Sequence, residues 1–195
     1  MLVQHCMTRD PTVVSPHEPL TVAHEKMTAG SFRHLPVVHE GVLVGILTDR
    51  DLYRKGVNEQ AQVKMAMTQE PVTVSLVTPV ERAALLMVHH RISGLPVLKD
   101  GSLVGIITAT DLLKAVAEMT AVAADDCIRV NLLDKGSLVE AAQLINRLGG
   151  TLIGMGRYTE PADQRPVCFL RLRGVDGTVA AEQLRSEGYT VLSVH

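Results

Sequence analysis

The chain has 195 residues, of which 46% are hydrophobic and 21% charged, and its formal net charge is −2. This near-neutral balance gives no sign of a nucleic-acid surface or a polybasic membrane patch, and no apolar run approaches the roughly 18 residues that span a bilayer. The start of the chain lacks the pattern of a secretion signal, and its three cysteines form no C-x-x-C pair, so we expect a cytoplasmic protein without disulfides or a metal centre.

An internal repeat organises the first part of the chain. When the sequence is shifted by 60 residues, positions 7–52 align with positions 67–112 without a gap, and nineteen of the 46 aligned pairs are identical. A repeat of this size indicates a supersecondary unit that buries its apolar face only against its copy. We therefore expect a first repeat at 1–60, a second at 61–121 and a separate domain at 127–195.

Both repeats have the same predicted element order, β-α-β-β-α. The elements expected in the first are a strand at 12–14, a helix from Pro19 to Gly30, strands at 35–38 and 42–47 around a tight turn, and a helix from Asp49 to about Lys55, with Gly56 as its stop. Those expected in the second are a strand at 72–74, a helix at 79–89, strands at 95–98 and 103–107, and a helix from 109 to about 119. The near-continuous apolar strands predict sheets that helices cover.

A different unit follows a short joint at 121–126. Its predicted elements are a strand at 128–132, a helix capped by Ser137 that runs to 148, strands at 151–155 and 167–172, a helix at 175–187 and a strand at 190–194. This order, βαββαβ, is that of the ferredoxin-like split βαβ fold. The predicted fold class is therefore α/β (α+β), with two repeats packed as a pseudo-two-fold pair and a ferredoxin-like domain after them.

A Thr-x-x-Asp element recurs in both repeats, as Thr48 with Asp51 and Thr108 with Asp111. A strand ends at the threonine, whose hydroxyl and the unpaired N–H groups of the following helix suit a phosphate. The aspartate offers two acceptor oxygens to the 2′ and 3′ hydroxyls of a ribose. Together they predict a nucleotide site, although a capping box would also account for the two residue types. Capping leaves the matched Gly-Ile before the threonine and the Leu-Pro-Val of the neighbouring strand unexplained.

Residues 1–120 resemble a tandem CBS-domain pair, or Bateman module. The motifs that carry the resemblance are RHLPVV with VGILTDRDL in the first repeat, and HRISGLPVL with VGIITATDL in the second. The resemblance implies a non-catalytic regulatory protein. Its effector would be an adenine nucleotide (AMP, ADP or ATP) or another adenosyl ligand, bound between the repeats.

Carried over position by position, the resemblance implies two composite sites. One would consist of Ile46, Thr48, Asp51, Met67, Thr68, Val72, Ile92 and Ser93. The other would consist of Ile106, Thr108, Asp111, Met7, Thr8, Thr12, Phe32, Arg33 and His34. Backbone groups of the opening strands would read the adenine edge, and apolar side chains would sandwich its ring.

The two copies differ in their cations. The first has Arg33, His34 and Arg50 where the second has Ser93, Gly94 and Thr110, whereas Arg91 and the His89-His90 pair belong to the second alone. We expect the two sites to differ in affinity for phosphates, or only one of them to be occupied. Each arginine could instead be a solvated surface charge, and the histidine pair lacks a third ligand at the spacing a metal needs.

The C-terminal domain resembles an ACT domain, with Asp134-Lys-Gly-Ser-Leu138 at its first strand–helix turn, although the usual Pro-Gly register is missing. The resemblance implies a homodimer, and we favour a dimerisation unit without a ligand over an amino-acid site. Two CBS copies followed by such a domain are similar to the acetoin-utilisation accessory protein family.

Two alternatives to the regulatory function stay open: an enzyme that acts on nucleotides, for which we find no P-loop or nucleophile-and-base set, and a ligand-free scaffold. The sequence does not identify the protein target of such a regulator.

Overall fold

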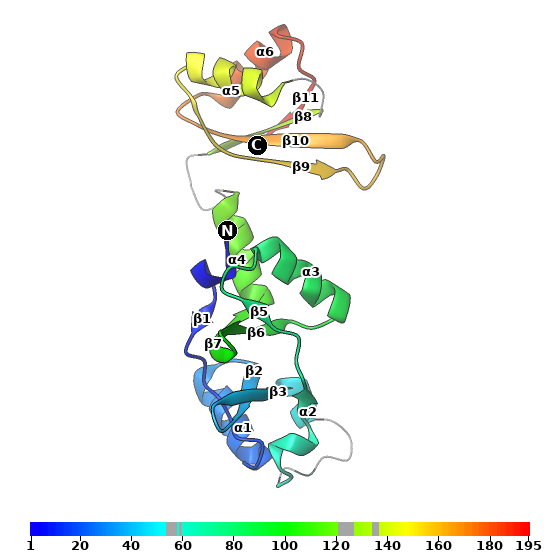
Figure 1. Cartoon of the computed structure of the whole chain (residues 1–195). Coiled ribbons are helices and arrows are strands. Elements are labelled where there is room, and N and C mark those ends of the chain that lie inside the picture. Colours follow the sequence, from blue (N-terminus) through cyan, green and yellow to red (C-terminus); the bar gives the residue numbers. More distant parts are fainter. Residues whose placement is uncertain (54–57, 59, 121–126, 134–136) are drawn as a thin grey trace. The chain divides into compact units, whose positions relative to one another are not determined.

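A computed structural model describes residues 1–53, 58, 60–120, 127–133 and 137–195 (Figure 1). The chain divides into two compact units, Met1–Ala115 and Val116–His195, which we describe one by one. In the described part of the chain, no helix combines the length and the apolar character needed to cross a membrane.

The two repeats have matching elements. Those of the first are a 3-10 turn η1 (Val3–His5), β1 (Thr8–Arg9), α1 (Leu20–Gly30), β2 (His34–His39), β3 (Val42–Thr48) and α2 (Asp49–Leu52). Those of the second are η2 (Val63–Met65), β4 (Thr68–Gln69), β5 (Val74–Ser75), α3 (Val80–His90), β6 (Gly94–Lys99), β7 (Ser102–Thr108) and α4 (Ala109–Met119). The helices and long strands predicted for the two repeats are therefore all found among the described residues.

Local differences from the prediction have simple causes. Pro19 and Pro79 lie at the N-caps of α1 and α3 in extended conformation, one residue before the helices begin. The strand expected at 12–14 is reduced to one parallel bridge between Val14 and Val37, because the chain on either side carries no further pairing. The helix expected to reach Lys55 is seen as α2 up to Leu52, and its predicted end at residues 55–56 lies outside the described residues.

The first ten residues of each repeat, 1–10 and 61–70, pack on the other repeat; we call them the opening segments. Strand β1 pairs antiparallel with β7, with Thr8 opposite Ile106, and β4 pairs antiparallel with β3, with Thr68 opposite Ile46. The resulting sheets have the orders β1-β7-β6-β5 and β2-β3-β4. Each sheet thus combines strands from both repeats.

Both hydrophobic cores are completed by the same exchange. Val3 and Met7 are buried in the core of the second repeat, among Leu95, Val97 and Ile107. In the same way, Val63 and Ala66 are buried in the core of the first repeat, with Leu35, Val37 and Leu47. A single repeat would leave its core open, which is the physical reason for the tandem arrangement that the sequence repeat predicted.

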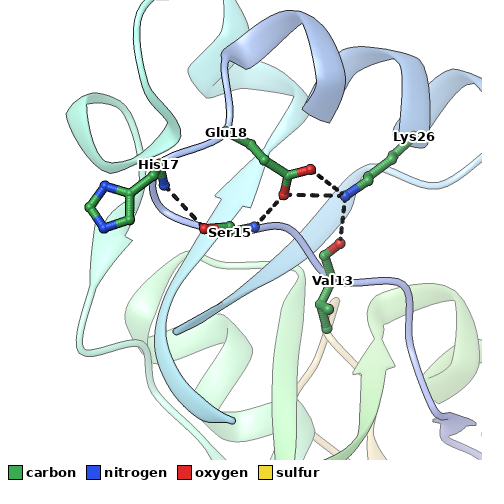
Figure 2. A network of polar contacts seen from close by, with 5 residues as sticks. All are labelled: Val13, Ser15, His17, Glu18 and Lys26. Atoms are coloured by element: carbon green, nitrogen blue, oxygen red, sulfur yellow. Dashed lines mark hydrogen bonds and ion pairs between the residues drawn. The ribbon is translucent and has the colours of Figure 1, made fainter. Parts of the chain in front are cut away.

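A polar network links the N-terminus of α1 to the strand bridge before it (Figure 2). The Glu18 carboxylate accepts a hydrogen bond from the Ser15 amide and forms an ion pair with Lys26. The Lys26 ammonium also donates to the Val13 carbonyl at 3.1 Å. Burial alone would raise the pKa of Glu18, but the Ser15 amide and Lys26 stabilise the carboxylate, and the pKa lies below its ordinary value. The network holds the Val13–Ser15 backbone beside β2.

The C-terminal unit has one antiparallel sheet with two helices on one face (Figure 1). Its elements are β8 (Ile128–Leu133), α5 (Leu138–Arg147), β9 (Thr151–Thr159), β10 (Pro166–Arg173), α6 (Gly177–Ser186) and β11 (Val191–Val194), with the strand order β11-β8-β10-β9. The predicted βαββαβ order is therefore the observed one. Strand β9 runs four residues past its predicted end, because residues 156–159 all continue the pairing with β10. Helix α6 begins at Gly177, two residues after its predicted start, because the Asp176 side chain caps it by accepting from the Thr178 and Val179 amides. The predicted joint at 121–126 and most of the turn at 134–137 lie outside the described residues.

Candidate functional site

Two clefts open between the repeats, one beside each Thr-x-x-Asp element. The Asp111 cleft has a volume of about 470 Å³, and the Asp51 cleft about 400 Å³, both in the ordinary range for small-molecule sites. The residues that line the Asp111 cleft are Thr8, Asp10, Pro11, Thr12, Gly30, Ser31, Phe32, Arg33, His34, Ser93, Ile106, Thr108, Ala109, Thr110 and Asp111. Those that line the Asp51 cleft are His34, Ile46, Thr48, Asp49, Arg50, Asp51, Thr68, Glu70, Pro71, Val72, His90, Arg91, Ile92, Ser93 and Gly94.

The structure brings together the two groups of residues that the sequence placed in composite sites, with two exceptions. Met7 and Met67 do not line either cleft. A Cβ atom added at Gly105 would lie 2.6 Å from the Met7 Sδ atom, and one at Gly45 would lie 2.6 Å from the Met67 Sδ atom. The methionines therefore pack against the glycines of β7 and β3, and contribute to the position of the opening segments.

Each cleft also has wall residues that the sequence analysis did not name. Asp10-Pro11 and Glu70-Pro71 continue the opening strands into the two clefts. Asp10 and Glu70 have left-handed backbone conformations, with φ of 45° and 47°, and so turn the chain at equivalent points. The identity of Pro11 and Pro71 in the repeat alignment was the available signal for this turn.

The two aspartates serve as helix caps. The Thr48 amide and hydroxyl donate to the Asp51 Oδ2 atom at 2.8 and 2.7 Å, and the Thr108 amide and hydroxyl donate to the Asp111 Oδ2 atom at 2.9 and 2.7 Å. The capping alternative that the sequence left open is thus realised in both repeats. Within the described residues, neither Oδ1 atom receives a hydrogen bond. One oxygen of each carboxylate therefore caps its helix, and the other is left as an acceptor on a residue that lines the cleft.

One contact between the repeats belongs to both clefts. The His34 Nε2 atom lies 3.0 Å from the Ser93 Oγ atom, and both residues line the Asp51 cleft as well as the Asp111 cleft. Burial lowers the pKa of His34; Asp49 and Asp51 act against this shift, whereas Arg33 and Arg50 add to it. The shared wall therefore holds a half-buried imidazole whose pKa lies below its ordinary value.

Cations are distributed unequally between the clefts. Exposed Arg33 lines the Asp111 cleft, whereas exposed Arg50 and Arg91 line the Asp51 cleft together with His90. His89 lines neither cleft and lies edge-on to His90, with ring centroids 4.8 Å apart. Among the described residues, no group of three or more His, Cys, Asp or Glu side chains is placed to hold a metal ion.

Comparison with known proteins identifies the repeated unit. The family model described as the CBS domain matches residues 3–58 and again residues 62–118. The chain belongs to the CBS domain family. Neither match reaches the C-terminal sheet, whose first strand begins at Ile128. A CBS domain-containing protein of Dictyostelium discoideum is 37% identical over 129 residues, which cover 58% of this chain and 89% of that protein.

Solved structures of other CBS proteins share the fold of the pair. The CBS domain pair of protein MJ0100, in complex with 5′-methylthioadenosine and S-adenosyl-L-methionine, is 28% identical with a TM-score of 0.56, over 60% of this chain and 97% of that one. CBSX2 in complex with AMP is 29% identical with a TM-score of 0.54, over 60% and 96% of the two chains. AcuB from Vibrio cholerae, assigned to acetoin utilization, is 28% identical with a TM-score of 0.55, over 60% and 91%.

Proposed function

We propose that this protein is a non-catalytic regulator that binds adenosyl ligands in the Asp51 and Asp111 clefts. One observation carries the proposal, and it holds at both clefts. Each cleft has a carboxylate oxygen without a hydrogen-bond partner among the described residues, and a buried isoleucine on the strand that leads into the aspartate's helix. A ribose needs such an acceptor, and an adenine ring needs such an apolar surface. Adenosyl ligands in the CBS pairs of MJ0100 and CBSX2 support the same ligand class.

Each cleft residue has a proposed role. The Oδ1 atoms of Asp51 and Asp111 accept hydrogen bonds from the ribose hydroxyls. The ring lies between Ile46 and Ile92 in one cleft, and between Ile106 and Phe32 in the other, because these pairs line the respective clefts. The remaining lining residues of the predicted sites serve the adenine edge and the phosphates: Thr8, Thr12, Arg33, His34, Thr48, Thr68, Val72, Ser93 and Thr108.

The ligand acts by favouring one arrangement of the repeats. Each cleft is lined by residues of both repeats, so a bound ligand contacts both and favours arrangements in which they are closer together. A ligand changes such an equilibrium only by its difference in affinity for the two arrangements. We propose AMP, ADP or ATP as the effector, and an as yet unidentified protein as the target.

The C-terminal unit transmits the signal in this proposal. Its order β11-β8-β10-β9 with two helices on one face is that of the ferredoxin-like fold, and we propose that it is an ACT-like dimerisation unit. The protein would then be a cytoplasmic homodimer, similar in domain order to the acetoin-utilisation accessory proteins.

Calorimetric titration of the full chain with AMP, ADP, ATP and adenosine, with turnover followed in the same samples, tests the proposal. We expect binding without hydrolysis.

Asp51→Ala and Asp111→Ala should each weaken binding at one cleft by about 1–3 kcal/mol, the cost of leaving ribose hydroxyls without an acceptor. Glu118→Ala, which removes an exposed carboxylate from the same helix as Asp111, is the control and should bind as the wild type does. Absence of binding by any adenosine compound, or hydrolysis that is lost in Asp51→Ala, would overturn the proposal.

A further inference from the structure

The two clefts share a wall made of one residue from each repeat. His34 opens β2 in the first repeat, and Ser93 immediately precedes β6 in the second. Their side chains meet at 3.0 Å, and each lines both clefts. Aligned by the repeat, His34 corresponds to Gly94, and Ser93 corresponds to Arg33. The wall is therefore asymmetric, with a single imidazole serving two sites.

Backbone contacts fix the position of this imidazole. A Cβ atom added at Gly94 would lie 2.7 Å from the His34 Cδ2 atom, so the ring packs directly against the backbone of the second repeat. The Asp49 amide donates to the Arg33 carbonyl at 3.1 Å, and the Ala109 amide donates to the Ser93 carbonyl at 3.0 Å. Both halves of the wall are thus tied to the first residues of α2 and α4, next to the two capping aspartates.

Charged groups of both signs surround the wall, and burial disfavours the charged form of its imidazole. Asp49 and Asp51 favour the protonated form of His34, and Arg33 and Arg50 oppose it, while burial has the largest effect and lowers the pKa. Farther along the cleft surfaces, Asp10 and Asp111 lie on one side, and Glu70, His90 and Arg91 on the other. A phosphate that entered either cleft would add negative charge beside the ring and offset the cost of burying an imidazolium.

We propose that His34 takes up a proton when a phosphorylated ligand enters either cleft, so that one side chain links both binding sites to pH. The inference rests on the proposed function, since it needs a phosphorylated adenosyl ligand in the clefts. Because both clefts share the His34 imidazole, His34 should take up at most one proton per chain even when both clefts are filled. Affinity should rise as the pH falls through the pKa of His34 in the complex, and level off below the lowered pKa of the ligand-free protein.

The test measures binding of AMP and of adenosine to the full chain between about pH 6 and pH 8. A single linked proton changes the dissociation constant by at most about tenfold per pH unit. We therefore expect AMP to bind about three- to tenfold more tightly at pH 6 than at pH 8, relative to His34→Gln, which keeps the AMP phosphate and every other cleft residue and so accounts for their titration. Adenosine should show no such difference. His39→Gln, at the exposed end of the same strand and outside both clefts, is the control and should keep the pH dependence of the wild type.

A direct measurement on the wild type covers the case in which His34→Gln does not fold. The imidazole resonance of His34 is titrated by NMR with and without saturating AMP. We expect AMP to raise the pKa of His34. AMP binding with no change in this pKa, or with equal pH dependence in the wild type and His34→Gln, would overturn the inference while leaving the proposed function intact. Failure of every adenosine compound to bind would overturn both.

Discussion

Single side chains at the clefts carry two tasks at once. Asp51 and Asp111 each use Oδ2 to cap a helix, through the amide and hydroxyl of the threonine three residues before. The same carboxylates line the clefts, where Oδ1 is proposed to hold a ribose. A loss of binding in an alanine variant therefore combines a local structural effect with the loss of a ligand contact, and the two have to be measured separately.

Substitutions of Asp111 can separate these effects. Asp111→Ala removes the cap and should lower the free energy of unfolding by about 1 kcal/mol. Asp111→Asn retains an oxygen that can accept from the Thr108 amide, so its stability should lie closer to that of the wild type. Both variants should weaken binding. Urea denaturation followed by circular dichroism measures the stabilities, and equal stability of all three proteins would contradict the capping role.

Glu18 gives a prediction on pH. Its folded-state pKa lies below the ordinary value of 4.5, so the carboxylate stabilises the fold above that value, and this contribution is lost as the pH falls through the lower folded-state pKa. Glu18→Gln should therefore lower the unfolding free energy at pH 7 by up to about 1 kcal/mol, the range of exposed ion pairs. The difference from the wild type should shrink steadily as the pH falls below 4.5. Denaturation curves from pH 7 into acid measure it, and a difference that does not decrease with pH would assign the effect to packing.

Among the elements, the short opening strands decide where the clefts form. Strands β1 and β4 have two residues each, yet they place Thr8 and Thr68 beside Ile106 and Ile46. The close approach needs glycine on the receiving strand, because a Cβ at Gly105 would lie 2.9 Å from the Thr8 carbonyl oxygen as well as 2.6 Å from the Met7 Sδ atom. The matched Gly-Ile before each threonine, which capping did not explain, has its structural reason here.

Gly105→Ala should therefore displace β1. We expect the unfolding free energy to fall by about 1–3 kcal/mol, the usual cost of adding a methyl group to a close-packed site. Nucleotide binding at the Asp111 cleft should weaken more than at the Asp51 cleft, since β1 borders the former. Ser102→Ala, at the exposed start of the same strand, is the control. Thermal denaturation and nucleotide titration of both variants measure the effect. If Gly105→Ala were as stable as the wild type, the close approach of β1 to β7 would not require glycine at this position.

The sequence predicted the long elements well, because each apolar run is bounded by a glycine or proline turn, as at Glu40-Gly41, where both residues have positive φ. The residue pattern alone did not show that the opening strands cross to the other repeat, since two residues such as Thr8 and Arg9 have no periodicity; the composite sites that implied it came from the CBS resemblance. It also placed Met7 and Met67 at the clefts, because a resemblance carries over positions but not side-chain directions. One sequence feature pointed to the shared wall. The second copy has Gly94 where the first has His34, and the His34 ring packs against the residue that lacks a side chain.

In the molecule as a whole, the unit of folding is the pair. Val3 is fully buried in the core of the second repeat, and Val63 in that of the first. The boundaries of the sequence repeat and those of the packed cores are therefore offset by the length of an opening segment. The C-terminal unit is independent of this exchange, since its core draws only on residues after 127.

This offset predicts a remote effect of Val3→Ala. Loss of two buried methyl groups should lower the unfolding free energy of the pair by about 2 kcal/mol. The loosening should appear in the second repeat, in β6 and β7, although the substitution is in the first. Hydrogen exchange read residue by residue measures it. Faster exchange confined to β2 and β3 would contradict the assignment of Val3 to the second core.

The exchange of opening segments also bears on how such a protein withstands dilution. A chain cut to one repeat would have to meet another molecule to fill its core, and its stability would depend on the amount of protein made. Joining the two halves in one chain keeps each at an effective concentration of the order of millimolar for the other. The assembled clefts therefore persist at any expression level, and only the effector concentration is left to vary.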